Sequence, residues 1–539
     1  MRRLLTVLAA GVPLAAAVCL PTASAEPRDG SAAAPFACSA PSVKAPAGTK
    51  VESVTAVSQE GGTIHGTGAL GGTVTGVPAY CEVTVTLTHP GDGDHAKVRT
   101  WLPVSGWNGR FQGLGGAAYQ AGDNGVGLGT AVKNGYAAVS TDAGVGDALD
   151  TSWALDSEGQ VNTALLKNFA SRSQHEAAAV GKEVVDAIYG KGPAYSYFTG
   201  CSTGGRQGYM EAQRYPDDYD GILADAPAVN WDEFEVATLW PQVVMNNEKT
   251  YPSKCEFDAF TNAAVKACDS LDGVKDGLVN DPSRCDFDPR RLIGTKVVCE
   301  GRELTAAAAD ATVVRKIWDG PRTVFGKKLW YGIPIGADIW ALAGHTDPDA
   351  DGNVVGTPFP VPAAWVKLWV AKDPSLDISK LTYGQFTQLF QQSQAEYDKV
   401  IGTDDPDLSA FRKSGGKLLS WHGLADEYIP TQGTVQYREK AERELGGAKR
   451  VDDFYRLFLA PGTNHCGLNG ADGSADGLAA LTAWVEHGKA PKTLPATLIN
   501  ASGQSVARDL CSYPQVSRYK GYGDPAVASS FKCVSPSRH

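Results

Sequence analysis

The sequence feature that most constrains the fold is a Gly-x-Ser-x-Gly pattern placed between a predicted strand and a predicted helix. Residues 194–199 are aromatic and apolar, as in a buried strand, and residues 207–214 form a helical run. Gly200, Ser202 and Gly204 lie between them. Because a sharp turn leaves little room for neighbouring Cβ atoms, these glycines fit a strained junction that exposes the serine. The pattern predicts a nucleophile elbow, and a plain glycine turn is the alternative.

Short apolar strands and amphipathic helices alternate before and after this junction. Residues 135–140 and 221–224 are typical of buried strands, and residues 168–189 carry an apolar face at helical spacing. Strands are predicted again at residues 417–421 and 455–459. Further helices are expected at residues 437–445 and 478–486. This alternation predicts an α/β fold with a parallel sheet.

The alternation stops between residues 230 and 406, where Trp, Asp, Pro and Cys are frequent. We interpret this segment as a lid domain inserted into the α/β core. The expected division of the chain is a signal peptide (1–25), a loose N-terminal tail (26–37), a catalytic domain (38–229 and 407–539) and the lid (230–406).

The first residues are typical of an export signal. Arg2 and Arg3 precede an apolar run at residues 4–20, and an Ala-Ser-Ala tripeptide at 23–25 is a small-x-small cleavage site, so the mature chain is expected to begin near Glu26. The net charge of -11 argues against a basic surface for nucleic acid. No later stretch is apolar enough to span a membrane. We therefore expect a secreted protein without nucleic-acid or membrane partners.

The cysteines support the same destination. Cys19 is removed with the signal, which leaves an even set, and an oxidising compartment favours disulfides. The remaining cysteines are Cys38, Cys81, Cys201, Cys255, Cys268, Cys285, Cys299, Cys466, Cys511 and Cys533.

A serine hydroxyl needs a base to become a nucleophile, and that base is usually a histidine held by a carboxylate. In α/β hydrolases the chain order is Ser, then Asp or Glu, then His, with the last two after late strands. Asp426 follows the strand predicted at 417–421, and His465 follows the strand predicted at 455–459. Glu427 is an alternative to Asp426, and His422 is an alternative to His465.

Cys201 immediately precedes Ser202, and Cys466 immediately follows His465. A shared hydrogen bond between the serine and the histidine would bring these two cysteines close enough for a disulfide. We predict the bond Cys201–Cys466, which would hold the nucleophile turn against the histidine loop. The alternative is that both are unrelated structural cysteines.

The chain resembles the tannase and feruloyl esterase family over roughly residues 38 to 533. The resemblance rests on the GCSTGGR block at 200–206, the PDDYDG block at 216–221 and Asn464-His465-Cys466. It implies an α/β-hydrolase core with a lid inserted between the serine and the aspartate. It also places the catalytic triad on Ser202, Asp426 and His465.

Stabilisation of an oxyanion requires two backbone N–H donors. We expect one from Thr203, which follows the nucleophile, and the other from the Gly-rich loop at Gly115 or Gly116. A plain turn is the alternative for that loop.

A second site is suggested by residues 268–278, where three carboxylates lie within eight positions. A solvated acidic loop explains this pattern as well as a cation site does. The family resemblance favours a structural calcium in the lid. The ligands that it implies are Asp269, Asp272, Asp276 and the carbonyls of Val274 and Leu278. Cys268 and Cys285 flank this loop and are expected to pair, and Cys255–Cys299 then follows by elimination.

The function that we expect is that of a secreted serine carboxylic ester hydrolase working through an acyl-enzyme. The resemblance implies esters of aromatic acids, hydroxycinnamic or gallic, as substrates, and calcium without an organic cofactor. A secreted serine peptidase and a non-catalytic, calcium-dependent glycan-binding protein are the alternatives. Trp330, Trp365 and Trp369 could contact a substrate ring, but core packing is the preferred interpretation.

Overall fold

The computed structural model describes residues 36–67, 71–299, 301–350, 352–470 and 473–536. The predicted signal peptide and most of the predicted tail lie outside these residues. Among the helices in the described ranges, none combines the length and the apolar character needed to cross a membrane.

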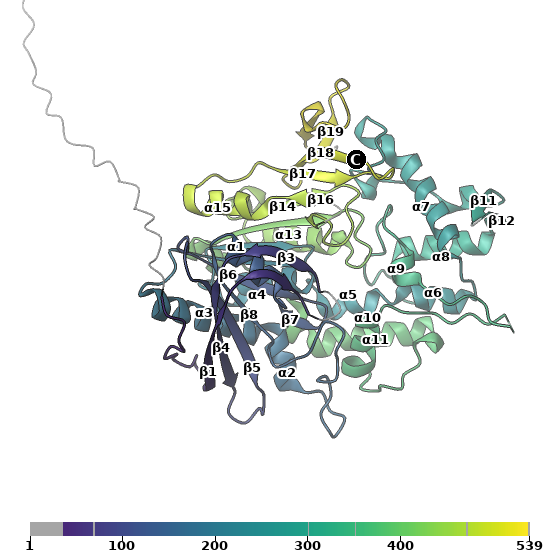
Figure 1. Ribbon diagram of the computed structural model, residues 1–539. Coiled ribbons are helices and arrows are strands. Elements are labelled where there is room, and N and C mark those ends of the chain that lie inside the picture. Colours follow the sequence, from purple (N-terminus) through teal and green to yellow (C-terminus); the bar gives the residue numbers. More distant parts are fainter. Residues whose placement is uncertain (1–35, 68–70, 300, 351, 471–472, 537–539) are drawn as a thin grey trace, which may run out of the picture.

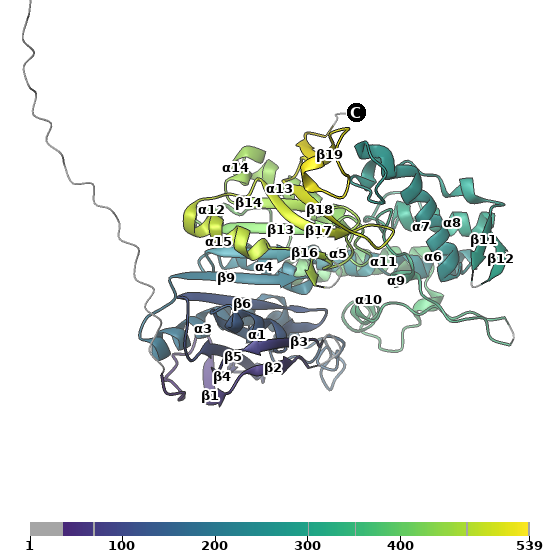
Figure 2. The ribbon, with the colours of Figure 1, turned by 45° about the horizontal axis from the view of Figure 1, so that its top comes forward.

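The centre of the molecule is a mixed sheet with the strand order β1-β4-β5-β8-β6-β9-β10-β13-β14, with β7 paired to β6. The strands from β8 and β6 through β14 are parallel, whereas β1, β4, β5 and β8 pair antiparallel. The bounds are β1 (Lys50–Gln59), β4 (Tyr80–Thr88), β5 (Ala96–Pro103), β6 (Arg110–Ala117), β7 (Gln120–Gly122), β8 (Ala137–Thr141), β9 (Tyr195–Cys201), β10 (Gly221–Asp225), β13 (Lys417–Gly423) and β14 (Tyr455–Ala460). In Figure 2 the sheet extends from β1 at the bottom toward β14 near the top.

The parallel strands are buried on both faces, which explains why they appear in the sequence as continuous apolar runs. Phe198 and Ile222 belong to one apolar cluster, with helices α3, α4 and α13, whereas Tyr197 and Leu223 belong to another, with α1 and α15. The helix bounds are α1 (Val126–Lys133), α2 (Thr163–Lys167), α3 (Ser173–Tyr189), α4 (Thr203–Arg214), α12 (Ser409–Ser414), α13 (Thr431–Glu444), α14 (Ala448–Asp452) and α15 (Gly477–His487). The result is a three-layer α/β/α core, as predicted.

Two predicted helices begin earlier in the structure than in the sequence analysis. Helix α4 starts at Thr203 instead of residue 207, and α13 starts at Thr431 instead of residue 437. The first turns of both helices are rich in glycine and polar residues, so the apolar periodicity gives no signal there. Both of these turns are nevertheless largely buried against the core, and tertiary contacts complete them.

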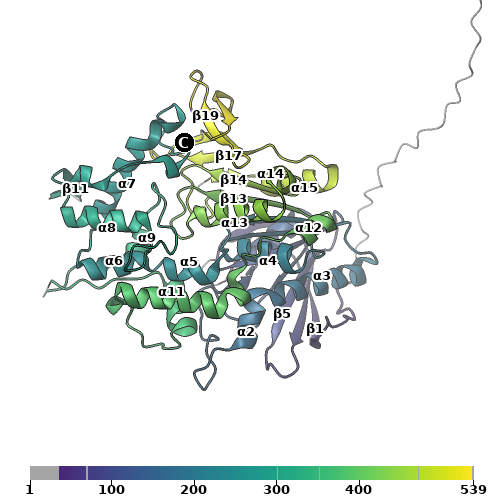
Figure 3. The ribbon, with the colours of Figure 1, turned by 180° about the vertical axis from the view of Figure 1, so that it is seen from behind.

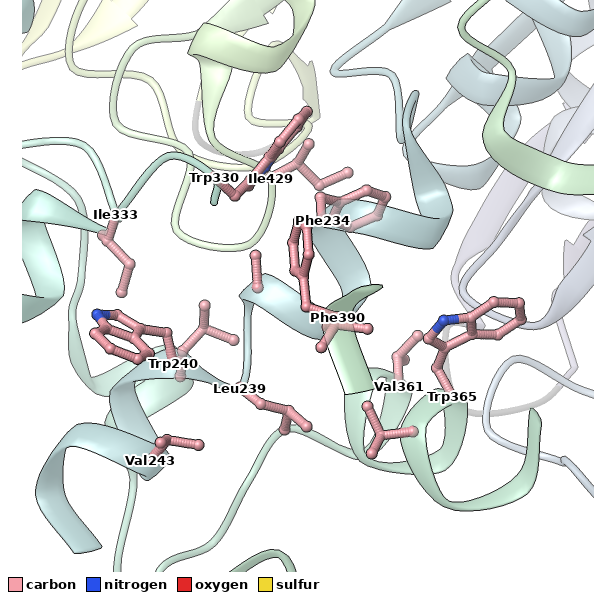
Figure 4. Close-up of a cluster of buried hydrophobic side chains, with 14 of the residues drawn as sticks. Phe234, Leu239, Trp240, Val243, Trp330, Ile333, Val361, Trp365, Phe390 and Ile429 are labelled. Atoms are coloured by element: carbon pink, nitrogen blue, oxygen red, sulfur yellow. The ribbon is translucent and has the colours of Figure 1, made fainter. Parts of the chain in front are cut away.

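The segment between β10 and α12 is largely helical and gathers to one side of the sheet, coloured teal to green in Figure 1 and seen from behind in Figure 3. Its helices are α5 (Trp231–Ala237), α6 (Trp240–Glu248), α7 (Lys254–Cys268), α8 (Ala308–Asp319), α9 (Trp340–Ala343), α10 (Pro360–Ala364) and α11 (Tyr383–Tyr397), with a hairpin of β11 (Lys296–Cys299) and β12 (Arg302–Thr305). Trp330, Trp365 and Trp369 are buried in a single apolar cluster, part of which Figure 4 shows. Core packing is therefore the confirmed role of these three side chains.

Smaller sheets complete the fold. They are the hairpin of β2 (Gly62–His65) and β3 (Thr73–Val77), the sheet of β15 (Asn469–Gly470), β16 (Gly473–Ala475), β17 (Thr493–Ile499) and β18 (Ser505–Cys511), and the pair β19 (Val516–Tyr519) and β20 (Phe531–Val534). All ten cysteines of the described residues pair. The disulfides are Cys38–Cys81, Cys201–Cys466, Cys255–Cys299, Cys268–Cys285 and Cys511–Cys533.

Candidate active site

The serine of the Gly-x-Ser-x-Gly pattern lies at a strained junction between β9 and α4. Ser202 has φ 63° and ψ -123°, a conformation that a non-glycine residue adopts only under constraint. A Cβ on Gly200 would lie 2.5 Å from the carbonyl carbon of Gly204, so no larger residue fits there. The Ser202 amide donates to the Asp225 carbonyl at 3.1 Å, which fixes the turn to the end of β10. This is the geometry that the sequence predicted for a nucleophile elbow.

The two partners predicted for this serine meet at the carboxyl ends of β13 and β14. The His465 Nδ1–H donates to Asp426 Oδ2 at 2.8 Å. The Asp426 side chain is completely buried, and its other oxygen accepts the amides of Tyr428 and Ile429 at 3.0 and 2.8 Å. Because Nδ1 carries the donated proton, the neutral imidazole has a free acceptor at Nε2.

The Ser202 hydroxyl forms no hydrogen bond with His465 among the described residues. Such contacts are often long before substrate binds and tighten afterwards. The serine and histidine loops are nevertheless held together, because the disulfide Cys201–Cys466 joins residues adjacent to each of them, with Cα atoms 6.1 Å apart. Cys466, like Ser202, has a positive φ, at 55°. The bridge therefore joins the strained Cys466 to Cys201, the residue that precedes the strained Ser202.

The structure also separates Asp426 and His465 from their alternatives. Glu427 Oε2 accepts a hydrogen bond from the backbone amide of His465 at 3.0 Å, so it supports the histidine loop, and among the described residues it forms no hydrogen bond with the ring. His422 is fully buried, and its Nε2 lies 3.1 Å from Asp426 Oδ2. Its Nδ1 lies 2.8 Å from the Thr434 hydroxyl. His422 is thus a second hydrogen-bond donor to the aspartate. Sequence analysis considered His422 only as an alternative to His465, because the order of residues along the chain does not show which side chains meet.

The electrostatics of the pair follow from this network. Burial alone would raise the pKa of Asp426, but the adjacent His465 and the hydrogen bond from His422 hold that pKa below its usual range. For His465 both effects have the opposite sign. Burial lowers its pKa, whereas the charge of Asp426 and the hydrogen bond to it raise the pKa above the ordinary value. The aspartate therefore stays ionised and stabilises a proton on the imidazole.

The two predicted sources of oxyanion donors have different outcomes. Thr203 is the first residue of α4, where a backbone N–H has no partner within the helix. The Gly116 amide, by contrast, donates to Gln207 Oε1 at 2.9 Å and is not free, which argues against its predicted role. Gly115 packs against the elbow so closely that a Cβ there would lie 2.5 Å from the Gly204 Cα. Close packing explains these glycines without an oxyanion contact.

The acidic loop of the helical segment brings hard oxygen atoms together. Asp269 Oδ1 accepts the amides of Asp276 and Gly277 at 3.0 Å each. Burial, with repulsion from the neighbouring carboxylates, raises the pKa of Asp272 to about 6. The buried Oδ1 of Asn280 has no hydrogen-bond partner within the described ranges of the chain. These donors suit a hard cation such as calcium, although Arg508 already pairs with Asp276.

A further group of potential metal ligands is His89, Asp92 and Asp94, whose ligand atoms lie within 4.8 Å of one another. Both ring nitrogens of His89 are engaged by carboxylates, at 2.7 Å from Asp94 and 2.7 Å from Glu176. This network links the β4–β5 hairpin to α3, and we assign it a structural role.

The fold and the arrangement of Ser202, His465 and Asp426 define the chain as an α/β hydrolase. A family model described as "Tannase and feruloyl esterase" matches residues 81–534. The chain is 49% identical over 463 residues to a "Probable feruloyl esterase" of Arthroderma benhamiae, covering 84% of this chain and 85% of the relative. It is 32% identical over 481 residues to "Feruloyl esterase B" of Aspergillus niger, covering 84% and 86%.

Solved structures agree with these relatives. The "Tannin acyl hydrolase from Aspergillus niger" superposes with a TM-score of 0.81 at 26% identity, covering 92% of this chain and 93% of that one. Feruloyl esterase B from Aspergillus oryzae gives a TM-score of 0.76 at 28% identity, covering 91% and 97%. The chain belongs to the tannase and feruloyl esterase family, and it is a carboxylic ester hydrolase.

Proposed function

We propose that this chain is a secreted serine esterase that hydrolyses esters of aromatic acids, hydroxycinnamic or gallic, through a covalent acyl-enzyme. The observation that carries the proposal is the strained Ser202, whose neighbour Cys201 is joined by a disulfide to Cys466 in the histidine loop. The His465 imidazole of that loop is held by a buried aspartate. The names of the relatives support the aromatic substrate class. The five disulfides of the described residues suit an oxidising, extracellular destination.

In the proposed reaction, the Ser202 hydroxyl oxygen attacks the ester carbonyl carbon while His465 Nε2 takes the hydroxyl proton. The Thr203 amide donates to the developing oxyanion. When the tetrahedral intermediate collapses, the ester C–O bond breaks and His465 returns the proton to the leaving alcohol. Water then attacks the acyl-enzyme by the same route, releasing the aromatic acid and restoring Ser202. Asp426 stabilises the imidazolium at both stages.

We propose in addition that the loop from Asp269 to Leu278 holds a structural calcium. Asp269, Asp272 and Asp276 would supply carboxylate oxygens, and Val274 and Leu278 backbone carbonyls. Burial, and after it repulsion from neighbouring carboxylates, raises the pKa of Asp272, and a bound cation would offset that repulsion. The ion would stabilise the fold at this loop and take no part in the reaction.

The decisive experiment is a hydrolysis panel of methyl ferulate, methyl gallate and a peptide substrate, with wild type and Ser202→Ala. The expected result is turnover of at least one aromatic ester, no peptide cleavage, and loss of turnover in the variant. A fluorophosphonate should label wild type at Ser202 and leave the variant unlabelled. Residual esterase activity in Ser202→Ala close to wild type would refute the serine mechanism.

A further inference from the structure

Glu235, on α5, is a buried carboxyl group without a partner. Its residue exposure is only 4%, and its carboxylate forms no hydrogen bond or ion pair within the described part of the chain. Its oxygens are not among the fully enclosed, unpartnered side-chain oxygens of the described residues. Burial raises the pKa of Glu235 well above its ordinary value. Because a buried carboxyl group without a hydrogen bond costs free energy, its presence points to a partner outside the chain.

The position of this carboxyl group relates it to the nucleophile. The Thr203 hydroxyl donates to the Ala118 carbonyl at 2.7 Å, and Tyr119 is the next residue. Burial raises the pKa of the Tyr119 phenol, and the nearby Glu235 charge raises it further, so the two side chains lie close to each other. One turn before Glu235 on α5, Trp231 packs edge-on against Tyr119, with ring centroids 5.9 Å apart. Glu235 therefore faces the segment that contacts the start of α4.

A second series of contacts leads from the same place to the catalytic histidine. The Tyr119 hydroxyl donates to the Val361 carbonyl at 2.9 Å. Two residues earlier, the Phe359 ring packs on Tyr428 with centroids 4.7 Å apart. Tyr428 in turn packs edge-on against His465 at 5.6 Å. These contacts place aromatic side chains next to both His465 and Tyr119, and aromatic side chains pack favourably against a flat aromatic ring.

We propose that the Glu235 carboxyl group binds a ring hydroxyl of the aromatic acyl group and so selects hydroxylated acids over unsubstituted ones. The hydroxyl hydrogen would be donated to a carboxyl oxygen while the ring lies against the aromatic side chains. This inference rests on the proposed function, since it concerns the acyl group that Ser202 would carry. Sites built to hydrogen-bond a hydroxyl reject analogues that lack it, because their polar group is then left unpaired.

The test compares methyl 4-hydroxycinnamate with methyl cinnamate, which differ only in the hydroxyl group; for an enzyme that prefers gallates, the pair is methyl gallate and methyl benzoate. Wild type should prefer the hydroxylated ester by about 10- to 100-fold in kcat/KM, as expected for a hydrogen bond to an ionisable group. Glu235→Leu should abolish that preference, chiefly by lowering kcat/KM for the hydroxylated ester. Glu235→Gln keeps an acceptor oxygen and should retain part of the preference.

Glu233→Gln is the matched control on the same helix, because the Glu233 carboxylate already accepts hydrogen bonds from the side-chain amides of Asn230 and Gln394. It should leave the preference unchanged. Equal wild-type turnover of both esters would overturn the inference, and this measurement needs no variant to fold. An undiminished preference in Glu235→Leu would overturn it as well. Failure of the proposed function looks different, because no aromatic ester in either pair would then be hydrolysed.

Discussion

Removal of the disulfide between the nucleophile turn and the histidine loop tests the central geometry. The bond closes a segment of 265 residues. Chain entropy alone assigns such a closure about 5.6 kcal/mol, and the Cys511–Cys533 bond, which spans 22 residues, about 3.4 kcal/mol. For a chain of this length the unfolding entropy converts these values into Tm losses of about 5 °C and about 3 °C. The two bonds are therefore expected to stabilise the protein to a similar degree, and only Cys201–Cys466 lies beside the catalytic residues.

Activity should separate the two bonds. In Cys201→Ser/Cys466→Ser, the nucleophile turn and the histidine loop lose the covalent link between them, so the serine and the imidazole can move apart. Since a displacement of about 1 Å can cost about 100-fold, we expect kcat to fall about 10- to 100-fold at a temperature where the variant is folded. Cys511→Ser/Cys533→Ser should lose stability and keep its kcat.

The assay is ester hydrolysis with wild type and both double variants, beside thermal melts of the same samples. A Cys201→Ser/Cys466→Ser enzyme with a wild-type kcat would refute the idea that the bridge positions the catalytic groups. An equal loss of kcat in the Cys511→Ser/Cys533→Ser control would show that the effect is one of general stability.

Four further predictions concern His422, His465, Asp426 and the acidic loop. His422→Phe removes a donor to Asp426 and should lower stability by about 1–3 kcal/mol and shift the acid limb of kcat/KM, whereas an unchanged pH profile would limit His422 to packing. Because Asp426 raises the pKa of His465, kcat/KM should fall as pH decreases through that raised pKa. Asp426→Asn should move this acid limb of the pH profile to lower pH. An acid limb that stays in place would contradict the assignment of Asp426. The lowered pKa of Asp426 also predicts stabilisation that is complete above about pH 4 and lost as pH falls further, measurable by thermal melts across that range. Chelation should lower the wild-type Tm by about 2 °C if calcium is present at about 100 times its Kd, and should leave the Tm of Asp272→Asn unchanged. An unshifted wild-type Tm would count against a cation.

Much of this site could be predicted from order along the chain. The apolar run before Gly200 and the helix after it are local patterns, so the elbow could be recognised without tertiary information. Asp426 and His465 follow late strands of a parallel sheet, and the carboxyl ends of such strands meet at one edge. The Cys201–Cys466 bond followed from the same reasoning, because each cysteine adjoins a residue chosen independently.

Tertiary structure decided which of several neighbouring groups performs each role. Asp426 and Glu427 are adjacent in sequence, yet Asp426 accepts a hydrogen bond from the imidazole of His465, whereas Glu427 accepts one from the backbone amide of His465. The pairing of Gly116 with Gln207 and the isolation of the Glu235 carboxyl group are likewise invisible in the sequence. The physical reason is that periodicity fixes which elements form, whereas the direction of a side chain after a strand ends depends on packing with residues that are distant along the chain.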